Sequence, residues 1–219
     1  MGAYSAIVSF FQNGGIFMWP IVVVLALGMA IAIERWLYLT MTTANNQSLW
    51  KKVTPYLKQG NFSAAMQVTG KSKAAIAQIM TYGLNRVRSA RRREDVEQAM
   101  EESLMEVMPK LEKRTHYLAT FANIATLLGL LGTIIGLINA FTAVSNANPA
   151  EKADMLSASI SVAMNTTAFG LMVAIPLLLV HTVLQTKTTS IIDSLEMASV
   201  KFLNAITESG GDQPAPAKA

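Results

Sequence analysis

The sequence predicts an all-α integral membrane protein with three transmembrane helices and long cytoplasmic helical extensions. The first reason is composition, since 52% of the 219 residues are hydrophobic and 15% are charged, whereas soluble domains have about 25% charged residues. The second is that the apolar residues gather in three charge-free runs, each long enough to cross a bilayer core of about 30 Å. The third is that no segment alternates apolar and polar residues as a strand does.

Composition also excludes several kinds of chemistry. The chain has no cysteine, which removes disulfides, thiolate metal sites and a cysteine nucleophile. Its two histidines, His116 and His181, lie near the cytoplasmic ends of apolar runs, and we interpret them as interfacial polar residues rather than catalytic bases. The net charge of +4 is too small to indicate nucleic-acid binding. We therefore expect a protein that is not an enzyme, with no catalytic residue, no metal site and no cofactor.

The first transmembrane helix is predicted over residues 16–39, after a periplasmic N-terminus at residues 1–15. Its charge-free core, residues 16–33, has 18 residues, which at about 1.5 Å per residue just span the bilayer core. A cleaved signal peptide is the alternative, and it would need a basic region ahead of the apolar run. Residues 1–15 contain no Lys or Arg, so a retained helix is favoured.

The second and third transmembrane helices are predicted over residues 118–144 and 155–184, with a periplasmic loop at residues 145–154 between them. Neither helix contains Asp, Glu, Lys or Arg. Both contain polar side chains, however, and such groups in hydrocarbon usually face other helices or water. The ones of interest are Thr133, Ser161, Asn165, Thr166 and Thr167. Two polar helices beside one plain apolar helix indicate that the polar helices form the inside of the membrane part and the apolar helix its outside.

Basic residues give the predicted orientation. Of the 18 Lys and Arg residues, none precedes the first span and 14 lie between Glu34 and Tyr117. By the positive-inside rule, the segment 40–117 and everything after the third span are cytoplasmic. We expect a multi-pass protein of the bacterial inner membrane with its N-terminus outside and its C-terminus inside.

The cytoplasmic segment 40–117 is predicted to be a helical domain, because short apolar-periodic stretches alternate with glycine-containing breaks. In its last part the apolar residues at 96, 100, 104, 107 and 111 recur at helical spacing. We expect this amphipathic helix to run directly into the second span. A further cytoplasmic helix is predicted at residues 185–207, and the Gly- and Pro-containing tail 208–219 is predicted to be disordered.

Glycines mark the predicted contact between the polar helices. Gly132 and Gly136 are four residues apart, so they share a helical face and let a neighbouring helix approach closely. Gly129 and, in the third span, Gly170 are assigned the same packing role. Thr133 lies among these glycines, and its hydroxyl either bonds a carbonyl of its own helix or lines a hydrated path.

Three motifs resemble the ExbB/TolQ/MotA family of ion-driven inner-membrane motor subunits. Residues 127–136, LLGLLGTIIG, are similar to the second-span signature of the family, PLLGLLGTVxG. Residues 165–176 resemble its third-span motif, TTAxGLxVAIP, and residues 31–39 resemble the ERxxxL ending of its first span. The motifs occur in order and at matching topology, and the three spans resemble ExbB and TolQ rather than the four-span MotA.

The sequence departs from this family at two positions. Thr126 stands where the family usually has Pro, and Val162 stands where many ExbB and TolQ members have an acidic residue. No carboxylate remains in either polar span, so this chain alone offers no titratable acid at membrane depth.

The resemblance implies a pentamer of this subunit around a pore that holds two helices of an ExbD/TolR-like single-span partner carrying an Asp. It implies use of the proton-motive force to energise TonB-type envelope transport or envelope maintenance, with a TonB/TolA-like protein as a further partner. It assigns the pore wall to Thr133, Thr166 and Thr167. Ser161 and Asn165 share one helical face and are added to this ion pathway by their spacing, with a helix–helix hydrogen bond as the alternative for Asn165. The resemblance favours H⁺ as the coupling ion, and the polar oxygens leave Na⁺ open. The alternatives are a non-conducting scaffold for partner helices, which Val162 favours, and a solute carrier, which the absence of an inverted repeat disfavours.

Overall fold

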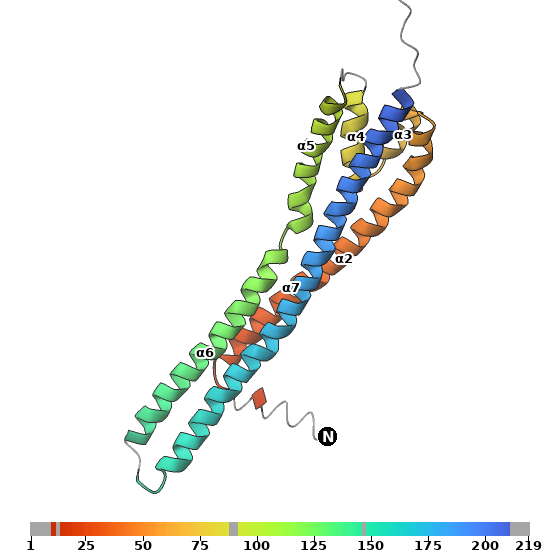
Figure 1. The fold of residues 1–219 in the computed structure, drawn as a ribbon. Coiled ribbons are helices and arrows are strands. Elements are labelled where there is room, and N and C mark those ends of the chain that lie inside the picture. The colour runs from red at the N-terminus through yellow and green to blue at the C-terminus, as the bar shows by residue number, and fades with distance from the viewer. Residues whose placement is uncertain (1–9, 12–13, 88–91, 146–147, 211–219) are drawn as a thin grey trace, which may run out of the picture. The chain divides into compact units, whose positions relative to one another are not determined.

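The computed structural model describes residues 10–11, 14–87, 92–145 and 148–210. Within these residues the secondary structure is helical and contains no strand (Figure 1), which confirms the predicted all-α class. Three long helical stretches are apolar enough to cross a membrane, namely Met18–Lys58, Arg93–Ser145 and Lys152–Glu208. Most of the predicted N-terminal segment 1–15, part of the loop 145–154 and most of the tail 208–219 lie outside the described residues.

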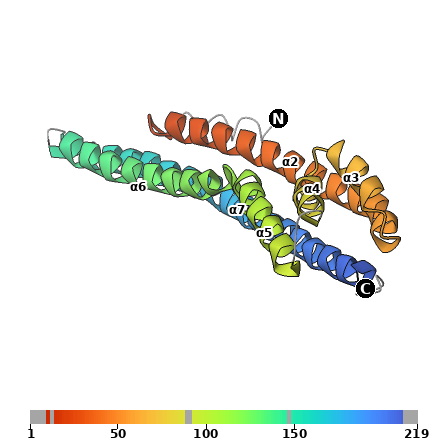
Figure 2. The same ribbon diagram turned by 90° about the horizontal axis from the view of Figure 1, so that it is seen from above.

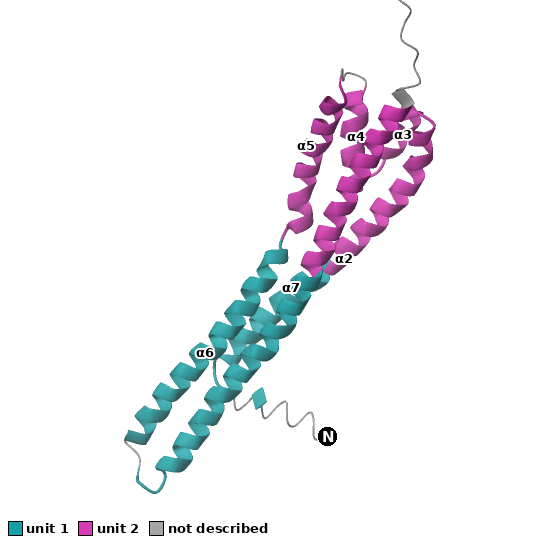
Figure 3. Ribbon diagram, viewed as in Figure 1, with its two compact units in different colours: residues 1–35, 114–183 teal, residues 36–113, 184–219 magenta. Residues whose placement is uncertain are grey.

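The chain divides into two compact units (Figure 3). Unit 1 consists of residues 1–35 and 114–183, and unit 2 consists of residues 36–113 and 184–219. The helices are α2 (Met18–Lys58), α3 (Phe62–Gly70), α4 (Ala75–Val87), α5 (Arg93–Glu112), α6 (Thr115–Ser145) and α7 (Lys152–Gly210). Because α2 and α7 continue through both units, the helix ends do not mark the predicted ends of the first and third spans.

The junction between α5 and α6 differs from the prediction. The amphipathic helix does not run directly into the second span, because α5 ends at Glu112 and α6 begins at Thr115. Lys113 has a ψ of 132°, and Arg114 has a φ of 66°, in the left-handed region. The Lys113 N–H donates to the Pro109 carbonyl at 3.0 Å, which satisfies one of the free carbonyls at the end of α5. The spacing of apolar residues did not predict this break, because the two non-helical residues Lys113 and Arg114 interrupt the helix without interrupting the pattern of apolar residues.

Unit 1 packs the first part of α2, α6 and the first part of α7. Figures 1 and 2 show α6 and α7 running alongside one another. Helix α2 contacts α7 at Gly28, where a Cβ would lie 2.7 Å from Leu177. Large apolar side chains such as Leu127 and Leu179, 62% and 63% exposed, lie on the outside of this unit. Exposed apolar surface of this extent is typical of contact with lipid or with other membrane helices.

Unit 2 has its own hydrophobic core, where α4, α5 and α7 meet at Gly83. A Cβ at Gly83 would lie within 2.9 Å of both Met100 and Phe202, and Phe202 is completely buried. The second part of α2 is joined to this core by Asn46, whose buried Oδ1 accepts the Ile76 N–H at 3.2 Å. This bond satisfies one of the N–H groups that the first turn of α4 leaves free.

Candidate functional site

The contact between α6 and α7 is a contact of backbones. A Cβ on Gly170 would lie 2.7 Å from the Ala125 carbonyl oxygen and 3.1 Å from Gly129 Cα. A Cβ on Gly129 would in turn lie 3.2 Å from Thr167 Cα. Only residues without a side chain fit at such a distance, so Gly129 and Gly170 determine how closely the two polar helices approach.

The close approach brings two of the predicted threonines together. Thr167 Oγ1 donates to the Gly129 carbonyl oxygen across the helix contact at 2.9 Å. Thr133 Oγ1 lies 3.2 Å from the same carbonyl and hydrogen-bonds Thr167 Oγ1. Both threonines are half-buried. Two hydroxyls and one carbonyl therefore form a polar cluster, which we call the threonine cluster, inside otherwise apolar helices.

Thr166 faces a different neighbour. Its side chain is 2% exposed, and its hydroxyl lies 2.5 Å from the Gly14 carbonyl oxygen and 3.0 Å from the Val162 carbonyl oxygen. Its methyl group packs against Gly132, where a Cβ would lie 2.5 Å from Thr166 Cγ2. In the single chain Thr166 thus joins α7 to α6 and to the segment before α2.

The remaining predicted polar residues lie closer to the surface of α7. Asn165 is half-buried and Ser161 is exposed, one turn earlier on the same helical face. Gly136, predicted to serve in helix packing, lies opposite Ala163, whose Cβ would be 2.8 Å from a Cβ added at Gly136. The structure therefore brings together Thr133 and Thr167, and it places Asn165 and Ser161 where a second molecule can contact them.

Two contacts in unit 1 escaped the sequence analysis. The Arg114 guanidinium donates to both oxygens of the Glu34 carboxylate at 2.7 and 2.8 Å, which joins the end of the first apolar run to the start of α6. The Gly14 carbonyl that accepts from Thr166 is 152 residues away in sequence. Opposite charges at adjacent ends of two predicted spans could have indicated the ion pair, but nothing in the sequence indicates the second contact.

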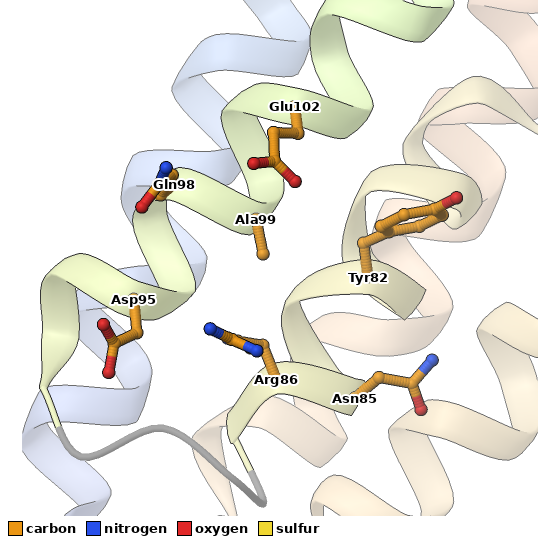
Figure 4. A pocket seen from close by; sticks show the side chains of 7 residues that line it. All are labelled: Tyr82, Asn85, Arg86, Asp95, Gln98, Ala99 and Glu102. Carbon is orange, nitrogen blue, oxygen red and sulfur yellow. The ribbon is translucent and has the colours of Figure 1, made fainter.

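A surface depression in unit 2, about 530 Å³ in volume, lies between α4 and α5 (Figure 4). Its lining residues are Tyr82, Asn85, Arg86, Asp95, Gln98, Ala99 and Glu102, and the Arg86 side chain extends from α4 toward α5 (Figure 4). This lining includes no histidine, serine or threonine. Among the described residues, no group of three His, Asp or Glu side chains could hold a metal ion.

Three apolar membrane-length stretches, two of them joined by a half-buried hydroxyl cluster, define a multi-pass membrane protein with a polar contact between two of its helices. The chain belongs to the MotA/TolQ/ExbB proton channel family, whose model matches residues 71–197. The family suggested by the three motifs is thus confirmed, and it is a family of channel subunits by its description.

Relatives agree with this assignment. The chain is 28% identical over 196 residues to a Methanothermobacter thermautotrophicus protein named as a biopolymer transport protein ExbB homolog, covering 89% of this chain and 68% of the relative. It is 34% identical over 93 residues to the Tol-Pal system protein TolQ of Haemophilus influenzae, covering 42% and 40%. It is 45% identical over 53 residues to the biopolymer transport protein exbB1 of Vibrio cholerae, covering 24% and 23%. The matches to the two bacterial proteins span less than half of their length.

Proposed function

We propose that this chain is the inner-membrane channel and motor subunit of an envelope energising complex. It uses the proton-motive force together with an ExbD/TolR-like single-span partner, and it energises TonB-type transport or envelope maintenance through a TonB/TolA-like protein. The observation that carries the proposal is the threonine cluster on α6 and α7. Family membership also supports the proposal, since the matched residues 71–197 include all of α6 and the part of α7 up to residue 197.

The chain needs a charge carrier from outside itself. Moving one charge through a membrane potential yields about 2.3 kcal/mol per 100 mV, and α6 and the charge-free part of α7 contain no acidic side chain to accept it. We assign that role to a partner Asp, which is neutralised by a proton from the periplasmic side and releases it to the cytoplasmic side. Thr133, Thr167, Asn165 and Ser161 supply the oxygens that face water or that carboxyl group. Thr166, whose side chain is buried in the single chain, packs α7 against Gly132 of α6 through its methyl group.

Orientation belongs to the same proposal. Fourteen of the 18 basic residues lie between Glu34 and Tyr117, and the positive-inside rule puts them in the cytoplasm. The N-terminus and the loop between α6 and α7 then face the periplasm.

A non-conducting scaffold for partner helices is the second candidate, and Val162 favours it, because this position lacks the acid that many family members carry. Ion flux separates the two candidates. Vesicles containing this chain and its single-span partner should conduct ions, and vesicles containing the chain alone should not. A complex that assembles with the partner and conducts nothing would establish the scaffold.

The first prediction concerns assembly. We expect a homo-oligomer, most simply a pentamer, because a monomer would expose the polar groups of Ser161 and Asn165 to lipid, where unpartnered polar groups are costly. Native mass spectrometry of the protein in detergent and in nanodiscs measures the stoichiometry. A stable monomer in both environments would contradict the prediction.

The second prediction concerns the coupling ion, which we propose to be H⁺. Hydroxyl and amide oxygens also suit Na⁺, a hard cation that takes oxygen ligands, so the ion has to be identified by experiment. In vesicles holding the subunit and its partner, activity should persist in sodium-free medium and collapse when a protonophore is added. Strict dependence on external sodium would instead make Na⁺ the coupling ion.

A further inference from the structure

Two grooves flank the cytoplasmic part of α7 in unit 2. The first, which we call the basic groove, lies between α2 and α7, has a volume of about 480 Å³, and is lined by Lys187, Lys201, Met197 and Trp50 among others. Its lining contains two lysines and no acidic residue. Lys187 is held at its rim, where Nζ donates to Thr40 Oγ1 at 2.6 Å.

The second, which we call the acidic groove, lies between α5 and α7 and has a volume of about 440 Å³. Its lining contains three carboxylates, Glu97, Glu101 and Glu196, and no basic residue. The apolar part of this lining includes Met105, which is 68% exposed, and Val200, which is 51% exposed. The two grooves thus carry opposite charges, and each has an exposed methionine in the apolar part of its lining.

The grooves lie on opposite flanks of α7, and the α7 residues that line them overlap along the helix between residues 196 and 201. At about 100° per residue, the centres of the two sets of α7 lining residues are roughly 170° apart around the helix. Met100 and Phe202 both reach Gly83, so Glu101 of α5 and Lys201 of α7, their chain neighbours, lie at one level of unit 2. Met105 lies one turn after Glu101 on α5, and Met197 lies one turn before Lys201 on α7. Because the two helices are antiparallel, both methionines are displaced in the same direction.

Charged side chains lie beside these apolar groups in both grooves. Met197 is 57% exposed beside Lys201, and Met105 is 68% exposed beside Glu101. Exposed methionine within a polar rim is typical of a protein interface, where its flexible side chain adapts to a partner. A partner of the basic groove must be acidic with an apolar centre, and the acidic groove of this same chain has that chemistry.

We propose that the basic groove of one copy packs against the acidic groove of the next copy, with Lys201 facing the Glu101 of its neighbour and Met197 facing its Met105. The contact joins two different surfaces, so it is heterologous. Copies in one membrane share their orientation to the membrane plane, so each contact rotates the next copy about the membrane normal, and such contacts form a ring where the rotation closes. This inference rests on the homo-oligomer of the proposed function and identifies the surfaces that build it.

Disulfide trapping tests the contact on a favourable background, since the chain has no native cysteine. Under oxidation in membranes, the double variant Met197→Cys/Met105→Cys should give a ladder of covalent oligomers on a non-reducing gel. Each single variant should give no covalent dimer, because neither surface meets its own copy. A covalent dimer from a single variant would mean a two-fold symmetric contact and would overturn the proposal.

Charge reversal provides a second measurement that does not depend on the cysteine geometry. In the double-cysteine chain, Lys201→Glu or Glu101→Lys alone should lower the ladder yield several-fold, and the two reversals together should restore it. Both positions are exposed, so the substitutions should leave the fold of each chain intact, which circular dichroism of the purified variants checks.

Native mass spectrometry of the same samples separates this inference from the proposed function. An oligomer without a ladder would overturn the groove contact and leave the homo-oligomer standing, whereas a monomer would overturn both. A phospholipid adduct that is lost in Lys201→Glu, with no ladder in the double variant, would assign the basic groove to an anionic lipid headgroup instead.

Discussion

Replacing Gly170 by Ala should destabilise the protein and prevent its assembly, although Ala is the better helix former by about 1 kcal/mol. The new methyl group would lie 2.7 Å from the Ala125 carbonyl oxygen and 3.1 Å from Gly129 Cα. These are backbone atoms, which cannot rotate away as a side chain can. Helices α6 and α7 must therefore separate, and overpacking of this kind costs about 1–3 kcal/mol. The melting temperature of the detergent-solubilised oligomer, followed by size-exclusion chromatography, measures the effect.

Gly70 offers a matched control for this substitution. It ends α3, and a Cβ added there meets no atom within 4 Å, so Gly70→Ala should leave the melting temperature unchanged or raise it slightly. A Gly170→Ala protein as stable as the wild type would contradict the backbone contact between α6 and α7. A loss in both variants would instead indicate a general sensitivity to Gly→Ala changes.

The sequence was most informative where one physical requirement acts on many residues. A helix that crosses a bilayer requires about 20 consecutive apolar residues. The three membrane-length stretches could therefore be located from the distribution of apolar and charged residues along the chain. Glycine spacing on one helix likewise indicated the face on which Gly132 and Gly136 lie. In both cases the signal is local, because it lies within one continuous segment of the chain.

Contacts between distant segments could not be predicted in this way. Thr133 and Thr167 were both candidate polar residues, but their shared acceptor, the Gly129 carbonyl, depends on the distance and rotation between two helices. The sequence gives neither quantity. Thr166 shows the consequence, since one position along a helix turns its side chain by about 100°, away from the threonine cluster and toward the Gly14 carbonyl.

The break between α5 and α6 is another feature that periodicity missed. Arg114 adopts a left-handed backbone conformation, which is unusual for a non-glycine residue. Its guanidinium is paired with Glu34, a residue 80 positions away. The ion pair joins two distant segments, and a window of neighbouring residues contains no sign of it.

Removing the hydroxyls of the threonine cluster should strongly lower energised activity while leaving assembly intact. The double variant Thr133→Val/Thr167→Val keeps the shape of both side chains and replaces each hydroxyl by a methyl group. An interhelical hydrogen bond in a membrane contributes about 0.6 kcal/mol on average, and the glycine contact between α6 and α7 remains, so the oligomer should survive. A water or carboxyl group that loses its partner in an apolar wall costs about 1–3 kcal/mol, and 1.4 kcal/mol is tenfold in rate. We therefore expect about a tenfold or larger fall in partner-dependent ion flux.

Two controls separate the hydroxyl from the side-chain shape. Thr133→Ser/Thr167→Ser keeps both hydroxyls and should retain most of the flux. Thr126→Val removes a hydroxyl that donates to the Ala122 carbonyl of its own helix at 3.1 Å. Because Thr126 lies outside the threonine cluster, this variant should also conduct normally, although the residue is on the same span. If the double Val variant conducts as well as the wild type, Thr133 and Thr167 serve helix packing alone. A hydroxyl that contacts the passing ions or water cannot be replaced by a methyl group without lowering the ion flux.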